Sequence, residues 1–177
     1  MLVLDATIRP CPRGALEHRH RLRQIAGTER TPTLVERATD RAYIGAEAAL
    51  RHLFGVYGDG RIPLRLRGRL ARRTSELATA LRGAPSQVKI PSVRPRQPLE
   101  LFGHEGSPGT RRARETLSAL GHTYVYRTRP FGSATHEGRS TRGLPRLYDP
   151  GVHRAVQGAD AIVRYLLETY GPDARAT

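Results

Sequence analysis

Residues 98–121 limit the possible folds of this chain more than any other stretch. They hold a short apolar run, then three glycines within seven residues, then an amphipathic segment that ends at Gly121. Ser107 followed by Pro108 is a typical helix start, because the hydroxyl accepts an orphan amide hydrogen bond and proline's fixed φ suits the first helical position. We therefore expect a strand at 99–102, a glycine turn and a helix. The functional site is expected at that turn, where backbone N–H groups and the positive helix end meet.

Length and composition limit the class of protein. The 177 residues suffice for one ordinary domain or two small ones. No apolar run reaches the roughly 18 residues of a membrane span, and no signal peptide is recognisable, so we expect a cytoplasmic protein. Cys11 is the only cysteine, which excludes an internal disulfide and a thiolate metal site. The seven histidines never fall at H-E-x-x-H spacing, so no metal is expected.

The net charge of +14 is concentrated in the middle of the chain. Residues 61–97 contain ten basic residues and one acidic residue, and four leucines there fall at helical spacing, at positions 66, 70, 77 and 81. We interpret this segment as a solvated helix that links two units. The alternative is that its arginines bind nucleic acid or another anionic surface, which would make binding strongly dependent on salt.

The other elements are predicted from periodicity and turn residues. Strands and helices alternate in a pattern typical of an α/β protein. We expect strands at 2–9, 31–36, 41–44, 122–127, 144–149 and 152–156, and helices at 15–26, 45–57 and 158–170.

The sequence contains an internal repeat. Residues 45–58 match residues 158–171 at seven of fourteen positions without a gap. The same offset pairs Pro32 with Pro145 and Glu36 with Asp149. Two copies of one unit are therefore predicted, with a partial first copy at 1–58, a basic linker at 59–97 and a complete second copy at 98–177.

The first copy lacks the counterparts of the strand and the helix in 98–121. Its sheet would keep an unpaired edge. Either a strand upstream of Met1 or packing of the two copies on each other is then needed to cover that edge.

Three motifs connect the chain to a known family: E-G-S-P at 105–108, P-C-P-R-G at 10–14 and D-A-I at 160–162. They resemble the thioredoxin-like N-terminal domain of glutathione S-transferases and the related glutaredoxins. The tandem arrangement is most similar to bacterial and plant proteins that carry two such domains. The resemblance implies a thioredoxin-like α/β fold in both copies, with the first strand and helix missing from the first copy, and glutathione or another low-molecular-weight thiol as ligand.

The resemblance also implies roles for individual residues. The position of the motif cysteine is occupied by Thr110, whose hydroxyl cannot form a mixed disulfide. Ser107, three residues earlier, is placed to hold the thiolate of bound glutathione, unless it serves as the helix cap alone. Pro145, like Pro32 in the first copy, matches the family's cis-proline, and Leu144 would contact the thiol through its main chain.

The start of the last helix is the second thiol-binding element that the resemblance implies. In the family, an acid and a serine bind the γ-glutamyl carboxylate there, whereas this chain has Gly158 and Ala159 before Asp160. Loss of the hydroxyl should weaken binding by about 1.5–3 kcal/mol. The helix N–H groups remain and still favour an anion.

The functional prediction is a divergent member of this family, with weak or absent thiol chemistry and a binding or scaffold role. An active transferase that uses Ser107 on a small thiol is the enzymatic alternative.

Overall fold

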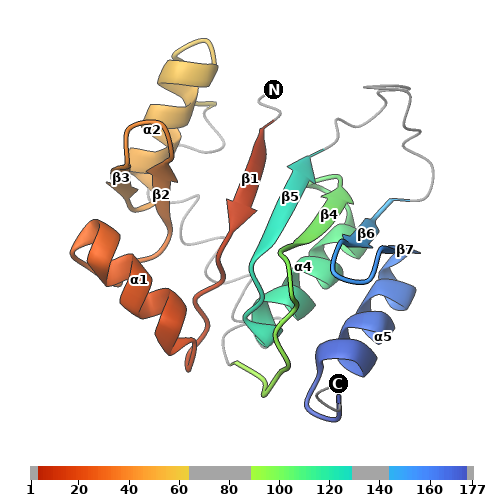
Figure 1. Cartoon of the computed structure of the whole chain (residues 1–177). Helices are drawn as coiled ribbons and strands as arrows, with labels where there is room; N and C mark the ends of the chain where they lie inside the picture. Colours follow the sequence, from red (N-terminus) through yellow and green to blue (C-terminus); the bar gives the residue numbers. More distant parts are fainter. Residues whose placement is uncertain (1–3, 64–88, 129–143, 175–177) are drawn as a thin grey trace. The chain divides into compact units, whose positions relative to one another are not determined.

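The computed structural model describes residues 4–63, 89–128 and 144–174. The chain divides into two compact units (Figure 1). Unit 1 comprises Met1–Leu2 and Leu16–Pro85, and unit 2 comprises Val3–Ala15 and Ser86–Thr177. The N-terminal strand thus belongs with the C-terminal elements. Among the described residues, no helix has the length and apolar character needed to cross a membrane.

Unit 2 is built on a five-stranded mixed sheet with the order β1-β5-β4-β6-β7 (Figure 1). Strand β4 lies in the middle, parallel to β5 and antiparallel to β6. Strands β6 and β7 form a hairpin, and β1 pairs antiparallel with β5 at the edge. The strands are β1 (Asp5–Ile8), β4 (Leu99–Gly103), β5 (Tyr124–Thr128), β6 (Arg146–Asp149) and β7 (Arg154–Gln157).

Helices α4 (Pro108–Leu120) and α5 (Ala159–Tyr170) pack against each other and against this sheet. Leu99 and Leu101 are two residues apart and therefore point to the same face of β4. They form one buried cluster with side chains of both helices and of the neighbouring strands. The cluster includes Ala113, Leu117, Leu120, Tyr124, Tyr126, Leu147, Ile162, Tyr165, Leu166 and Tyr170.

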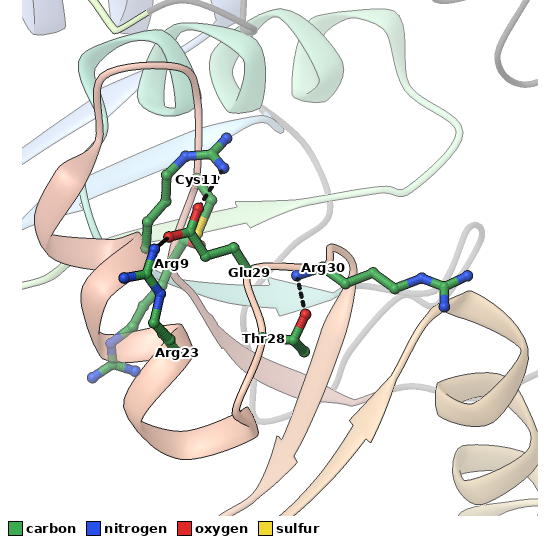
Figure 2. A network of polar contacts seen from close by, with 7 residues as sticks. Arg9, Cys11, Arg23, Thr28, Glu29 and Arg30 are labelled. Carbon is green, nitrogen blue, oxygen red and sulfur yellow. Dashed lines mark hydrogen bonds and ion pairs between the residues drawn. The ribbon is translucent and has the colours of Figure 1, made fainter.

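Unit 1 contains α1 (Leu16–Ala26), the hairpin of β2 (Thr33–Glu36) and β3 (Arg41–Ile44), and α2 (Ala46–Tyr57). Glu29 accepts hydrogen bonds from Arg19 and Arg23 of α1. The Thr28 hydroxyl accepts one from the Arg30 N–H, and Figure 2 shows Arg23, Glu29, Thr28 and Arg30. The two arginine contacts tie the turn after α1 to the helix. None of residues 16–63 is buried, so this unit has no closed core of its own among the described residues.

The expected elements that fall in the described residues are all present, with ends that differ by at most three residues. The predicted strand at 2–9 is found at 5–8, where it pairs with β5. The leucine-spaced helix expected within 61–97 lies mostly outside the described residues, so binding of nucleic acid through it stays a prediction.

The β2–β3–α2 segment and the β6–β7–α5 segment share their internal geometry. The peptide bonds before Pro32 and Pro145 are both cis, as the resemblance implies. In the first hairpin Thr33 pairs with Ile44, and in the second Arg146 pairs with Gln157. Each residue of the second pair lies 113 positions after its equivalent in the first, so the two hairpins have the same register. The glycines before the two helices have φ of 89° and 88°. Each of these glycines donates its N–H to the carbonyl of the cis-proline, at 2.8 and 2.9 Å.

Candidate functional site

The start of α4 has the predicted geometry. Ser107 is the N-cap and Pro108 the first helical residue, while Gly121 ends the helix in the left-handed region at φ 69° and ψ 23°. The Ser107 hydroxyl accepts a hydrogen bond from the Thr110 N–H at 3.4 Å. This distance is longer than that of a good N–H···O bond, so the cap is weak. The hydroxyl proton of Ser107 can be donated to another group.

Thr110 faces the sheet. Its side chain is 1% exposed, and its Oγ1 has no hydrogen-bond partner among the described residues. A Cβ on Gly103 would lie 2.6 Å from this oxygen, so only glycine fits opposite Thr110. Ser107, which is half-buried, is therefore the residue of the pair that a ligand can reach.

An ion pair fastens the glycine-rich turn to α4. Arg114 Nη1 donates to both carboxylate oxygens of Glu105, at 2.7 and 2.9 Å. The guanidinium also lies over the ring of Tyr126, 4.9 Å from its centre. Burial works against the charge of Arg114, but Tyr124 and Glu105 raise its pKa above the usual value. The ion pair with Arg114 thus attaches the turn that carries Ser107 to α4.

The second element of the site is the segment before β6. The peptide bond from Leu144 to Pro145 is cis, and Pro145 is buried. The Pro145 carbonyl accepts the N–H of Gly158 at 2.9 Å. Gly158 precedes α5 with φ 88°, a value that residues with side chains rarely adopt. The hydrogen bond to Pro145 occupies the N–H of Gly158, which leaves the amides of the first turn of α5 to meet a ligand.

Gly109 brings the two elements together. A Cβ at this position would lie 3.2 Å from both Pro145 Cδ and Ala159 Cβ. Arg112 Nη1 donates to Asp160 Oδ1 at 2.6 Å, which joins the second turn of α4 to the first turn of α5. The start of α4, which carries Ser107, therefore lies close to Pro145 and to the start of α5, which carries Asp160. Thr110 faces the sheet instead.

The electrostatics of this junction favour an anion. The N-terminal ends of α4 and α5 both lie here, and each carries a partial positive charge. Arg112 is neutralised by Asp160, whose side chain is 78% exposed. A hydroxyl and free helix amides can hold a thiolate or a carboxylate. They cannot exchange electrons with it, because neither position 107 nor position 110 carries a thiol.

Cys11 lies after β1, where its Sγ donates to the Arg9 carbonyl at 3.7 Å (Figure 2). It is the single cysteine of the sequence. In the part of the chain that the structure describes, no group of three or more His, Cys, Asp or Glu side chains is placed to hold a metal ion.

The sequence analysis missed the residues that support the junction. The buried Asp149 carboxylate accepts hydrogen bonds from the hydroxyls of Tyr165 and Tyr170 and from the Gly151 N–H. This network ties the β6–β7 hairpin to α5 and so holds Pro145 against the helix start. Only the pairing of Asp149 with Glu36 in the repeat pointed to it. Nothing in the sequence pointed to Arg112.

Unit 1 contains a similar network around Glu36. Glu36 accepts a hydrogen bond from Thr39 at 2.6 Å and contacts His52 and Tyr57 at 3.2 and 3.4 Å. The offset of 113 residues that relates the two segments pairs His52 with Tyr165 and Tyr57 with Tyr170. The bond from Thr39, followed by the nearby His52, lowers the pKa of Glu36.

Comparison with known proteins identifies the C-terminal part of the chain. Residues 101–174 match the family model for the glutathione S-transferase N-terminal domain. The search of curated proteins and the search of solved structures gave no match. Residues 101–174 thus form a thioredoxin-like domain of this type, as the motifs implied.

Proposed function

We propose that the domain at residues 101–174 binds a small thiol, of which glutathione is the type, and does not exchange disulfides with it. The thiol would lie across the junction of Ser107, Pro145 and the start of α5. Its carboxylate would meet the amides of Ala159 and Asp160, and its sulfur would approach the Ser107 hydroxyl. The protein then acts as a binding or scaffold component in the cytoplasm, where low-molecular-weight thiols are kept reduced.

The contact that Gly109 makes possible is the main support for this proposal. The lack of a side chain at 109 lets the start of α4 approach Pro145 and Ala159. Ser107, Pro145 and the first residues of α5 would therefore surround one place, with the positive ends of α4 and α5 directed at it. Thr110 would hold Ser107 in place through its main-chain N–H, while its own side chain stays buried and does not contact the ligand.

A second candidate is an active transferase. The 3.4 Å cap hydrogen bond is weak, so the Ser107 hydroxyl can instead donate to a bound thiolate. The thiolate would then attack an electrophilic carbon and displace its leaving group, which departs with the electron pair of the broken bond. Ser107 would stabilise the thiolate and would not itself be alkylated.

We also propose that residues 1–58 and 98–177 are two copies of one unit, the first without its first strand and helix. The shared hairpin register, the two cis-prolines and the matching carboxylate networks support this view. The linker at 59–97 would join the copies.

Calorimetry with glutathione tests the binding proposal. The full chain should bind the thiol saturably, and Ser107→Ala should weaken binding by about 0.5–1.5 kcal/mol, roughly twofold to tenfold. Thr116→Ala is the matched control, because Thr116 lies on the same helix and its hydroxyl donates to the Arg112 carbonyl of that helix. It should bind as the parent does.

Two results would contradict the proposal. One is no heat of binding at millimolar glutathione, and the other is equal weakening by Ser107→Ala and Thr116→Ala. The transferase candidate requires in addition that the protein accelerates conjugation of glutathione to an electrophilic aryl halide. Activity that survives Ser107→Ala would exclude the role given to Ser107.

A further inference from the structure

In the described part of the chain, strand β2 of unit 1 has a neighbour on one side and an open edge on the other. Within the described residues it is hydrogen-bonded to β3 alone, whereas β6, its counterpart in unit 2, lies between β4 and β7. In an antiparallel pair, alternate N–H and C=O groups point away from the neighbour. The outer edge of β2 therefore presents main-chain groups that another strand can pair with.

The apolar face beside this edge is open as well. Tyr57 is 50% exposed, but its counterpart Tyr170 is 7% exposed. Leu34 is only half-buried, while Leu147 at the equivalent position is fully buried. Helix α2 contributes no buried residue, whereas α5 contributes four. The same hairpin and helix are thus covered in one unit and uncovered in the other.

Unit 2 shows what covers these surfaces. Strand β4 pairs with β6 so that Leu101 lies opposite Leu147. Helix α4, which follows after the glycine turn, packs on α5 and brings Ala113 and Leu117 into the core. The cover is therefore one continuous segment, a buried apolar strand followed by an amphipathic helix.

We propose that the β2 edge and the adjoining face of α2 form a docking site for a strand–helix segment of another polypeptide. The incoming strand would pair with β2 through main-chain hydrogen bonds and place an apolar side chain opposite Leu34, as Leu101 does opposite Leu147. The helix that follows would cover Leu53 and Tyr57 of α2, because their counterparts Leu166 and Tyr170 are buried in unit 2. This inference rests on the repeat proposed above and is independent of thiol binding.

The probe is a synthetic peptide of residues 98–121 of this chain. This segment contains β4 and α4, which cover β6 and α5 in unit 2. It is added to the full chain, and amide hydrogen exchange is followed by mass spectrometry. Exchange in 33–36 and 46–57 should slow by at least about tenfold. Exchange in 146–149 and 159–170 should not change, since β4 and α4 already cover those residues.

The control peptide carries Leu101→Asp, which puts a charge where the proposal needs an apolar side chain. It should give no protection. Because the change is made in the peptide, the folding of the protein is not affected. Absence of protection by the parent peptide at millimolar concentration would overturn the proposal, as would equal protection by both peptides.

Hydrogen exchange measured without added peptide tests whether the edge is instead covered by the same chain or by a second copy of it. Amides of 33–36 that are already protected in dilute protein would mean that the chain covers the edge itself. Protection that grows with protein concentration would mean that a second copy covers it. Either result overturns the proposed partner.

Discussion

The Tyr165 hydroxyl donates a 2.7 Å hydrogen bond to Asp149 Oδ2, and this bond joins the middle of α5 to the end of β6. Both side chains are buried, and Tyr170 donates to the same oxygen. A buried carboxylate is stable only when its oxygens are satisfied. The position of Pro145 relative to α5 therefore depends on this carboxylate.

Asp149→Asn should destabilise unit 2. The amide carries no charge, and one carboxylate oxygen becomes a nitrogen that cannot accept a hydrogen bond. We expect the free energy of unfolding to fall by about 1.5–3 kcal/mol. Urea denaturation followed by tyrosine fluorescence measures it. Asp160→Asn is the control, because its exposed ion pair with Arg112 should contribute no more than about 1 kcal/mol. Equal losses in the two variants would contradict the role of Asp149.

The same network predicts a loss of stability at alkaline pH. Burial, followed by the bond and charge of Asp149, raises the pKa of Tyr165 to about 12. An unfolded tyrosine titrates near about 10, so the folded state binds its proton more tightly. The stabilisation is complete below about pH 10 and is lost as the pH rises towards 12.

Urea midpoints measured from pH 9 to pH 12 check this, with Tyr165→Phe alongside. The parent midpoint should fall above about pH 10, and the decline should be shallower in the variant, which lacks the titrating hydroxyl. A parent midpoint that stays constant over this range would rule out the pKa shift.

Gly103→Ala should cost about 1–3 kcal/mol of stability, because the new methyl group would meet the side chain of Thr110. Thr110→Ala removes the obstructing atoms. The double variant should therefore be more stable than the sum of the single effects predicts, with a coupling energy of at least about 1 kcal/mol. Chemical denaturation of the four proteins measures this coupling. Additive effects would mean that the two side chains do not meet.

Ser107→Cys should produce a reactive thiol. A cysteine at a helix N-terminus has a lowered pKa, and the thiolate is the nucleophile. In a Cys11→Ser background, we expect alkylation by iodoacetamide at pH 7 to be at least about tenfold faster at position 107 than at position 110, where Thr110→Cys would place the sulfur in the core. Mass spectrometry of the quenched products gives both rates. Faster reaction at 110 would reverse the proposed accessibility of the two positions.

The sequence was sufficient to predict the elements of unit 2 because local signals were strong. Ser107, Pro108 and Gly121 marked both ends of α4 through capping chemistry, which involves only neighbouring residues. The cis-prolines at 32 and 145 followed from the family resemblance. The supporting contacts of the site could not be predicted. Arg112 and Asp160 are 48 residues apart, and no local rule links two exposed charges over that distance.

The sequence by itself determined where the strands and helices of the described residues lie, because caps, glycine turns and apolar periodicity act over a few residues. The residues proposed to line the site came from the family resemblance. Only the tertiary structure decided how the strands combine. It paired β1 with β5, which lies more than a hundred residues later, and it buried Thr110 under Gly103 while leaving Ser107 accessible. Strand pairing satisfies main-chain groups that are nearly identical in every strand, so the partner is chosen by the packing of the whole sheet.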